Sequence, residues 1–108
     1  MIIQLVYMTA GSLEEARTIG RTLVERRLAA CVNIIANMNS LYMWNGALQD
    51  DREVVVLAKT AAHRVPQLVD AVREIHSYAV PCVVSLPLTG GHQPFLDWVE
   101  AETGMTAA

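Results

Sequence analysis

Hydrophobic residues recur along the chain with two periods, one typical of strands and one typical of helices. Residues 2–8 (IIQLVYM) are apolar at odd and even positions alike, which indicates a strand covered on both faces. Residues 12–27 carry apolar side chains at helical spacing and open with the capping-box sequence Ser12-Leu13-Glu14-Glu15. Hydrophobic periodicity along the rest of the chain predicts further elements. In all, we expect strands at 2–8, 28–44, 53–60 and 82–88, helices at 12–27 and 61–76, and a short helix after Pro94.

The stretch from Leu28 to Thr60 predicts a long β-hairpin. Asn45-Gly46 stands between two β-prone arms, and this dipeptide favours a type I′ turn because both central residues need φ > 0. Tyr42 and Trp44 are two positions apart, so both aromatic rings lie on one face of the ribbon. Both arms exceed the usual strand of about 5–6 residues. A hairpin of this length overhangs its own sheet and needs a partner surface.

The predicted order contains two β-α-β crossovers that share the hairpin. It indicates an α/β sandwich with the ferredoxin-like order βαββαβ, both long helices on one face and an extra C-terminal helix. Pro87 places the last strand at a sheet edge or a bulge. The strands at 2–8 and 53–59 are apolar on both faces, but the helices can cover only one. We therefore expect another copy of the chain to bury the second face, in a homo-oligomer whose subunit number the pattern does not give.

Composition and charge narrow the class of protein. The 108 residues, 53% hydrophobic and 18% charged, suit one folded domain over 1–108. The net charge is −3 and the chain has no run of lysine or arginine, so the sequence does not predict a nucleic-acid-binding surface. No run reaches the ~18 apolar residues of a membrane span, and the N-terminal residues lack a leader pattern. With two cysteines and no export signal, we expect a cytoplasmic protein with reduced thiols.

Five segments that together span nearly the whole chain resemble the CutA family of divalent-cation tolerance proteins. They are LVERRLAACVNI (23–34), S-x-Y-x-W-x-G (40–46), Lys59-Thr60, His76-x-Tyr78 and F-L-x-W (95–98). The resemblance implies a compact homotrimer of ferredoxin-like subunits, tolerance of copper and other divalent ions, and copper binding by some members. The subunit also resembles that of PII-type signalling trimers, which bind small ligands in clefts between subunits.

The sequence departs from the family after the second predicted helix. The family pattern H-P-Y-E-x-P-E stands here as HSYAVPC (76–82), so Ala79 and Cys82 occupy the two acidic positions. A role that relies on those carboxylates does not carry over to this chain. Cys82 supplies a thiol at one of the two positions instead.

The favoured function is copper tolerance through non-catalytic metal binding, with Cys31, Cys82 and His76 as ligands, because thiolate and imidazole suit Cu(I) or Zn²⁺. The two cysteines fall on strands at opposite edges of a ferredoxin-like sheet, so a disulfide within one chain is not expected. In the implied trimer, Cys31 of one subunit would approach Cys82 of its neighbour. The alternatives are a packed thiol at Cys31 and a helix C-terminal cap at His76.

The second hypothesis is a PII-like signalling trimer that binds an anionic small molecule between subunits. Lys59-Thr60 ends a strand next to a helix start, where a small anion can bind, and Tyr42, Trp44 and Tyr78 would wall the cleft. The alternatives are a solvated lysine, a threonine N-cap and packing of the rings in an interface. No catalytic motif occurs, so we expect no enzyme. A third hypothesis is a stable assembly without a ligand.

Overall fold

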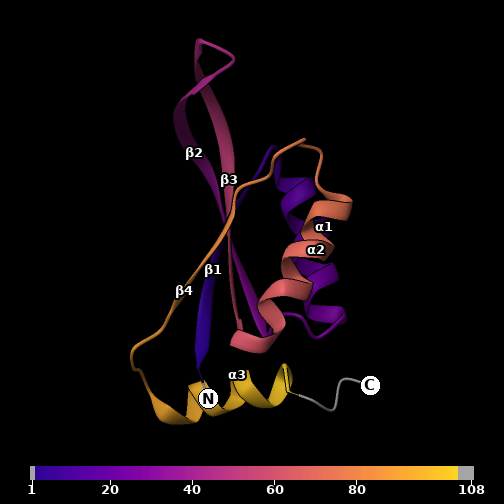
Figure 1. Ribbon diagram of the computed structural model, residues 1–108, viewed down its shortest axis with the longest axis vertical. Helices are drawn as coiled ribbons and strands as arrows, with labels where there is room; N and C mark the ends of the chain where they lie inside the picture. Colours follow the sequence, from indigo (N-terminus) through magenta and orange to yellow (C-terminus); the bar gives the residue numbers. More distant parts are fainter. Residues whose placement is uncertain (1, 105–108) are drawn as a thin grey trace.

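The computed structural model describes residues 2–104, which form a four-stranded sheet and three helices (Figure 1). The strands are β1 (Ile3–Ala10), β2 (Cys31–Trp44), β3 (Ala47–Ala61) and β4 (Val83–Pro87), and the helices are α1 (Leu13–Glu25), α2 (Val65–Ile75) and α3 (Gln93–Glu102). Neighbouring strands are antiparallel in the order β2-β3-β1-β4. The ferredoxin-like order with an added C-terminal helix is therefore confirmed.

The positions of the strands follow from their composition. β1 and β3, the two strands predicted to be apolar on both faces, are the central pair. β4 lies at an edge and ends at Pro87, which has no N–H to donate to a further strand. β2 forms the other edge, so the outer edges of β2 and β4 pair with no further strand of residues 2–104.

Helices α1 and α2 pack side by side on one face of the sheet and enclose the main core (Figure 1). Ser12 caps α1, because its Oγ accepts a hydrogen bond from the Glu15 N–H at 3.1 Å. The reciprocal half of the predicted capping box is not formed. The Glu15 carboxylate accepts instead from the N–H groups of Gly11 at 2.9 Å and Ser77 at 2.7 Å, which ties the start of α1 to the segment after α2.

The hairpin turns at Asn45-Gly46, as predicted. Both residues have positive φ, 52° at Asn45 and 80° at Gly46, and Trp44 pairs directly with Ala47. The return arm begins immediately after the turn, so β3 includes residues 47–52 (ALQDDR), which lay outside the predicted strand. All of them except the half-buried Gln49 are exposed, and the segment lacks an apolar alternation.

A β-bulge in β2 decides which face the aromatic residues occupy. The pairing shifts between Ile35 and Met38, with Asn37 at φ 66°. Because one extra residue stands opposite β3 here, the alternation of β2 reverses, and even-numbered residues beyond the bulge share a face with odd-numbered residues before it. Tyr42 and Trp44 thus lie on the face opposite α1 and α2.

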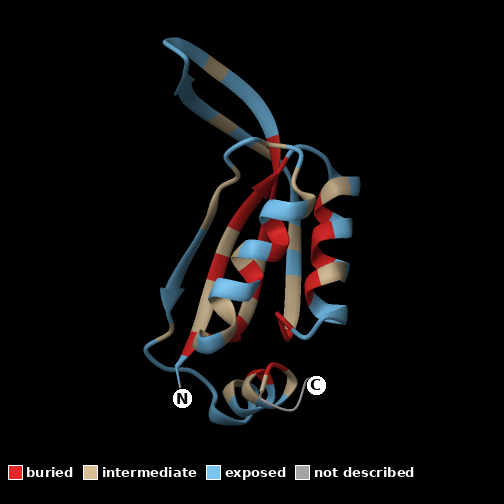
Figure 2. Ribbon diagram, turned by 45° about the vertical axis from the view of Figure 1, so that its right-hand side comes forward, coloured by how far each residue is buried: buried red, intermediate tan, exposed pale blue. Residues whose placement is uncertain are grey.

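We call the face of the sheet opposite α1 and α2 the open face. The strand register places these apolar residues on it: Leu5, Tyr7, Ile35, Leu57, Val84 and Leu86. Exposure is greatest toward the sheet edges, at 53% for Ile35 and 55% for Val84 (Figure 2). Within the described residues, no helix is long and apolar enough to cross a membrane.

Helix α3 packs across the end of the sheet opposite the hairpin tip (Figure 1). Thr103, which is fully buried, accepts a hydrogen bond from the Ala61 N–H at 3.2 Å and donates to the Val99 carbonyl at 2.7 Å. Arg64 donates to the carbonyl of Thr103 at 3.0 Å. These contacts attach the helix to the last residues of β3.

Replacement of Thr103 by valine should lower the free energy of unfolding by about 1–3 kcal/mol, because it leaves the buried Ala61 N–H without a partner at almost unchanged volume. Urea unfolding at fixed protein concentration measures the change. Thr103→Ser keeps the hydroxyl and serves as the control. If the valine variant is as stable as the serine variant, the hydrogen bond does not hold α3 in place.

Candidate functional site

A pocket of about 280 Å³ lies beneath the hairpin, on the same side as the open face. We call it the hairpin pocket, and three segments distant in sequence line it: the strand ends, the hairpin arms and the α2–β4 connection. Its lining residues are Thr9, Tyr42, Trp44, Gln49, Glu53, Tyr78, Val80 and Cys82.

Glu53 and Tyr78 form the polar centre of the hairpin pocket. The Tyr78 hydroxyl donates to the Glu53 carboxylate at 2.8 Å, and Glu53 is only 8% exposed. Burial, and then the hydrogen bond to Glu53, raise the pKa of Tyr78 well above its ordinary value, so the phenol stays neutral. No ion pair to Glu53 is found within residues 2–104, so a carboxylate is held against the pocket with only a neutral donor.

Tyr42 and Cys82 also line the hairpin pocket. The Tyr42 hydroxyl donates to Asp51 at 2.7 Å, and this bond raises the pKa of Tyr42. Burial, together with the nearby Glu53 carboxylate, raises the pKa of the Cys82 thiol. The pocket therefore holds a thiol and neutral phenols beside the carboxyl group of Glu53.

His76 does not line the hairpin pocket but is hydrogen-bonded to Tyr78, which does. Its imidazole is fully buried, its Nε2–H donates to the Thr9 carbonyl at 2.7 Å, and its Nδ1 accepts from the Tyr78 N–H at 3.0 Å. The Glu15 carboxylate lies 3.7 Å from Nδ1. Burial alone would raise the pKa of Glu15, but hydrogen bonds from Gly11 and Ser77, and the proximity of His76, lower it overall.

The structure separates the three predicted metal ligands. Cys31 and Cys82 are both half-buried free thiols, but they stand at opposite edges of the sheet. They are three strand spacings apart, about 14 Å, and four residues apart along the strands, about 13 Å. Both ring nitrogens of His76 are hydrogen-bonded within the chain. Residues 2–104 contain no group of three or more His, Cys, Asp or Glu placed to hold a metal ion.

The predicted cleft residues fall into two groups. Tyr42, Trp44 and Tyr78 meet in the hairpin pocket. Lys59 and Thr60 lie elsewhere, toward the end of β3 near α3. Lys59 donates to Asn33 and lies 6.0 Å from the Phe95 ring centroid. Thr60 is fully buried in the strand and is not the N-cap of a helix.

Sequence reasoning missed Glu53, Gln49 and Thr9. Glu53 was placed at the start of the return strand, where a charged residue next to an apolar run suggests only a strand end. One signal was available: Glu53, the last residue of the charged run 50–53, directly precedes Val54-Val55-Val56 in a strand that is buried on both faces. Its partner Tyr78 could not be identified, because it lies 25 residues away in the α2–β4 connection and the two residues meet only in the folded chain.

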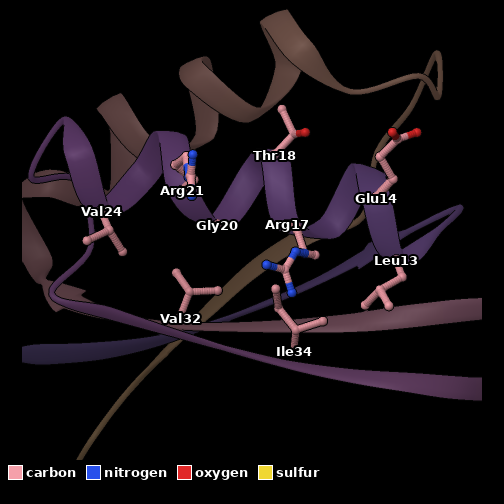
Figure 3. Close-up of a pocket in the computed structure, with 9 residues that line it drawn as sticks. All are labelled: Leu13, Glu14, Arg17, Thr18, Gly20, Arg21, Val24, Val32 and Ile34. Carbon is pink, nitrogen blue, oxygen red and sulfur yellow. The ribbon is translucent and has the colours of Figure 1, made fainter.

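A larger, shallower groove of about 760 Å³ runs between α1 and β2 on the other side of the molecule (Figure 3). Val32 and Ile34 form its floor, and Arg17 extends from α1 toward Ile34. None of the residues predicted to bind a metal or a ligand lines this groove. The hairpin pocket is therefore the candidate site.

Comparisons with known proteins agree over nearly the whole chain. Residues 4–102 match the family described as CutA1 divalent ion tolerance protein. The chain is 45% identical over 101 residues to the divalent-cation tolerance protein CutA of Thermus thermophilus, covering 94% of this chain and 98% of that protein. It is 41% identical over 101 residues to human protein CutA, covering 94% of this chain and 56% of that protein.

Solved structures give the same result for the fold. The Thermus thermophilus divalent cation tolerance protein superposes with a TM-score of 0.92 at 44% identity, covering 94% of this chain and 99% of that one. CutA1 from Oryza sativa superposes with a TM-score of 0.94 at 32% identity, covering 98% and 97%.

Proposed function

Because this chain belongs to the CutA family of divalent-ion tolerance proteins, we propose that it acts in divalent-cation tolerance by binding metal ions without catalysing a reaction, and that copper is the ion. The observation that carries the proposal is the position of the two free thiols. Both lie on the helix-free side of the sheet, one at each edge. A cytoplasmic protein would keep these thiols reduced and able to bind soft ions.

The active form in this proposal is a homotrimer. The open face carries apolar side chains with exposed fractions of about one half, which favours burial against further copies of the chain. β2 and β4 form the two edges of the sheet, so a head-to-tail contact between the β2 edge of one copy and the β4 edge of the next would close into a ring. The native mass should be three times the chain mass of 11.8 kDa.

The metal site in this proposal needs two copies of the chain. Within one chain the sheet keeps Cys31 and Cys82 too far apart to share an ion, whereas a contact between edges brings Cys31 of one copy toward Cys82 of the next. Two thiolates are a suitable ligand set for Cu(I). His76 would complete the set only if it released Thr9 or Tyr78, so its role in the ground state is to hold Tyr78 in place.

Cu(I) titration of the reduced oligomer, in competition with a chelator of known affinity, tests the metal site. We expect a fixed ratio of copper to trimer, with Cys31→Ser and Cys82→Ser each weakening binding at least about tenfold, a loss of about 1.4 kcal/mol. His63→Asn, which changes an exposed histidine away from both thiols, should bind as the wild type does. Unchanged affinity in the double serine variant would refute the proposed ligands.

A second function is favoured by one specific observation, namely that Tyr42, Trp44 and Tyr78 meet in one pocket. On this proposal the protein is a PII-like trimer that binds a small molecule in the hairpin pocket, which the neighbouring copy would close. The two functions depend on different residues. Copper binding requires the thiols, whereas ligand binding requires the aromatic wall and Glu53.

A further inference from the structure

We infer that the hairpin pocket binds a compact organic cation, an alkylated ammonium group held by aromatic rings and the carboxylate of Glu53. The inference rests on the second function proposed above and reverses the charge of the ligand expected from the sequence. An anion was expected because Lys59 and Thr60 were grouped with the aromatic residues. The structure places those two residues outside the pocket, which removes the only cation from the site.

The charge of the pocket lining favours a positive ligand. Glu53 is the one acidic residue of the lining, which contains no lysine, arginine or histidine, and it is 8% exposed. A carboxylate with this little water is costly unless a positive charge lies against it. Its identified partner within residues 2–104 is the neutral Tyr78 hydroxyl. An anionic ligand would be repelled by the Glu53 carboxylate, whereas a cationic ligand would compensate its charge.

The aromatic wall selects the kind of cation. Tyr42, Trp44 and Tyr78 contribute three ring systems to one small volume. Both phenol hydroxyls are already donated, to Asp51 and Glu53, so the rings rather than the hydroxyls remain available. Aromatic rings attract cations through their quadrupoles, and clusters of them recognise methylated ammonium groups in preference to strongly hydrated ions.

The hairpin pocket has too few oxygen ligands for a hard metal ion. Divalent cations such as Ca²⁺ take six to eight oxygen ligands, and Mg²⁺ takes six. Besides neutral hydroxyl groups, the lining offers one carboxyl group and the side-chain amide of Gln49, and the described residues contain no metal-binding group of three acidic, histidine or cysteine side chains. Its volume of about 280 Å³ also limits the ligand to a small molecule.

Calorimetric titration of the chelator-treated oligomer with choline tests the inference. Its neutral isostere, 3,3-dimethylbutan-1-ol, has the same shape without the charge. We expect choline to bind and the isostere to bind at least tenfold more weakly. Inorganic phosphate and ATP serve as anionic probes, and neither should bind. Equal binding of choline and its isostere, or binding of an anion instead, would overturn the inference while leaving a ligand-binding function in place.

Variants locate the binding to the pocket. Glu53→Gln keeps an acceptor for Tyr78 but removes the charge, and Trp44→Leu removes one ring. Each should weaken choline binding at least tenfold. Glu25→Gln makes the same charge change at an exposed position of α1 and should have no effect. Native mass read on each sample shows whether a loss comes from dissociation. If no probe of either charge binds the intact oligomer, both the inference and the small-molecule function fail.

Discussion

Replacement of Val84 by glutamate should give a folded protein that no longer assembles. Val84 is 55% exposed in a single chain, so a carboxylate there stays hydrated in the monomer. In the proposed trimer the open face is buried, and an unpaired buried charge costs several kcal/mol in each copy. We expect the native mass to fall from three chain masses to one, with an unchanged far-ultraviolet circular dichroism spectrum.

Leu13→Glu is the matched control for this change. Leu13 is 49% exposed at the start of α1, on the helix side of the sheet, and an acidic residue suits the first turn of a helix. Its native mass should equal that of the wild type. A Val84→Glu protein that keeps three chain masses would show that the open face of β4 is not an intersubunit contact.

Replacement of His76 by leucine should lower the free energy of unfolding by about 2–4 kcal/mol. The imidazole is fully buried and satisfies two backbone groups, the Thr9 carbonyl and the Tyr78 N–H. Leucine can satisfy neither, and each buried polar group left without a partner costs about 1–3 kcal/mol. Urea unfolding at a fixed protein concentration measures the loss, since the stability of an oligomer depends on concentration.

His76→Gln separates lost hydrogen bonding from lost volume. A glutamine amide can still donate to the Thr9 carbonyl, so we expect a smaller loss than for leucine. Because Tyr78 is held by His76, the leucine variant should also disturb the hydrogen bond between Tyr78 and Glu53 and weaken any ligand in the hairpin pocket. Equal stability of the leucine variant and the wild type would mean that these bonds are not needed to hold the α2–β4 connection.

Much of the fold was predictable because its causes are local. The capping residue Ser12, the turn at Asn45-Gly46 and the edge position of the strand that ends at Pro87 each follow from the chemistry of one or two residues. The two central strands were also predicted correctly, since apolar residues at odd and even positions alike require cover on both faces. The arm at 47–52 was not predicted to be a strand, because pairing with β2 rather than burial makes it one.

The candidate site was predictable only in part. Spacing placed Tyr42 and Trp44 on one face, whereas Tyr78 joined them only through the family resemblance, and all three residues line the hairpin pocket. Grouping Lys59 and Thr60 with them required contact between opposite ends of the β2–β3 hairpin, and alternation along a strand says nothing about distance across the fold. The partner of Glu53 lies 25 residues away, beyond the reach of any local pattern.

The sequence by itself determined the order of the elements, the hairpin turn and the surplus of apolar surface, because backbone preference and hydrophobic period are properties of neighbouring residues. The tertiary structure alone decided the face on which Tyr42 and Trp44 lie. One extra residue near Asn37 reverses the alternation of β2, and a bulge is placed by strand pairing and long-range packing rather than by the residue itself. That reversal brings the two rings to Glu53 and Tyr78 and so creates the hairpin pocket.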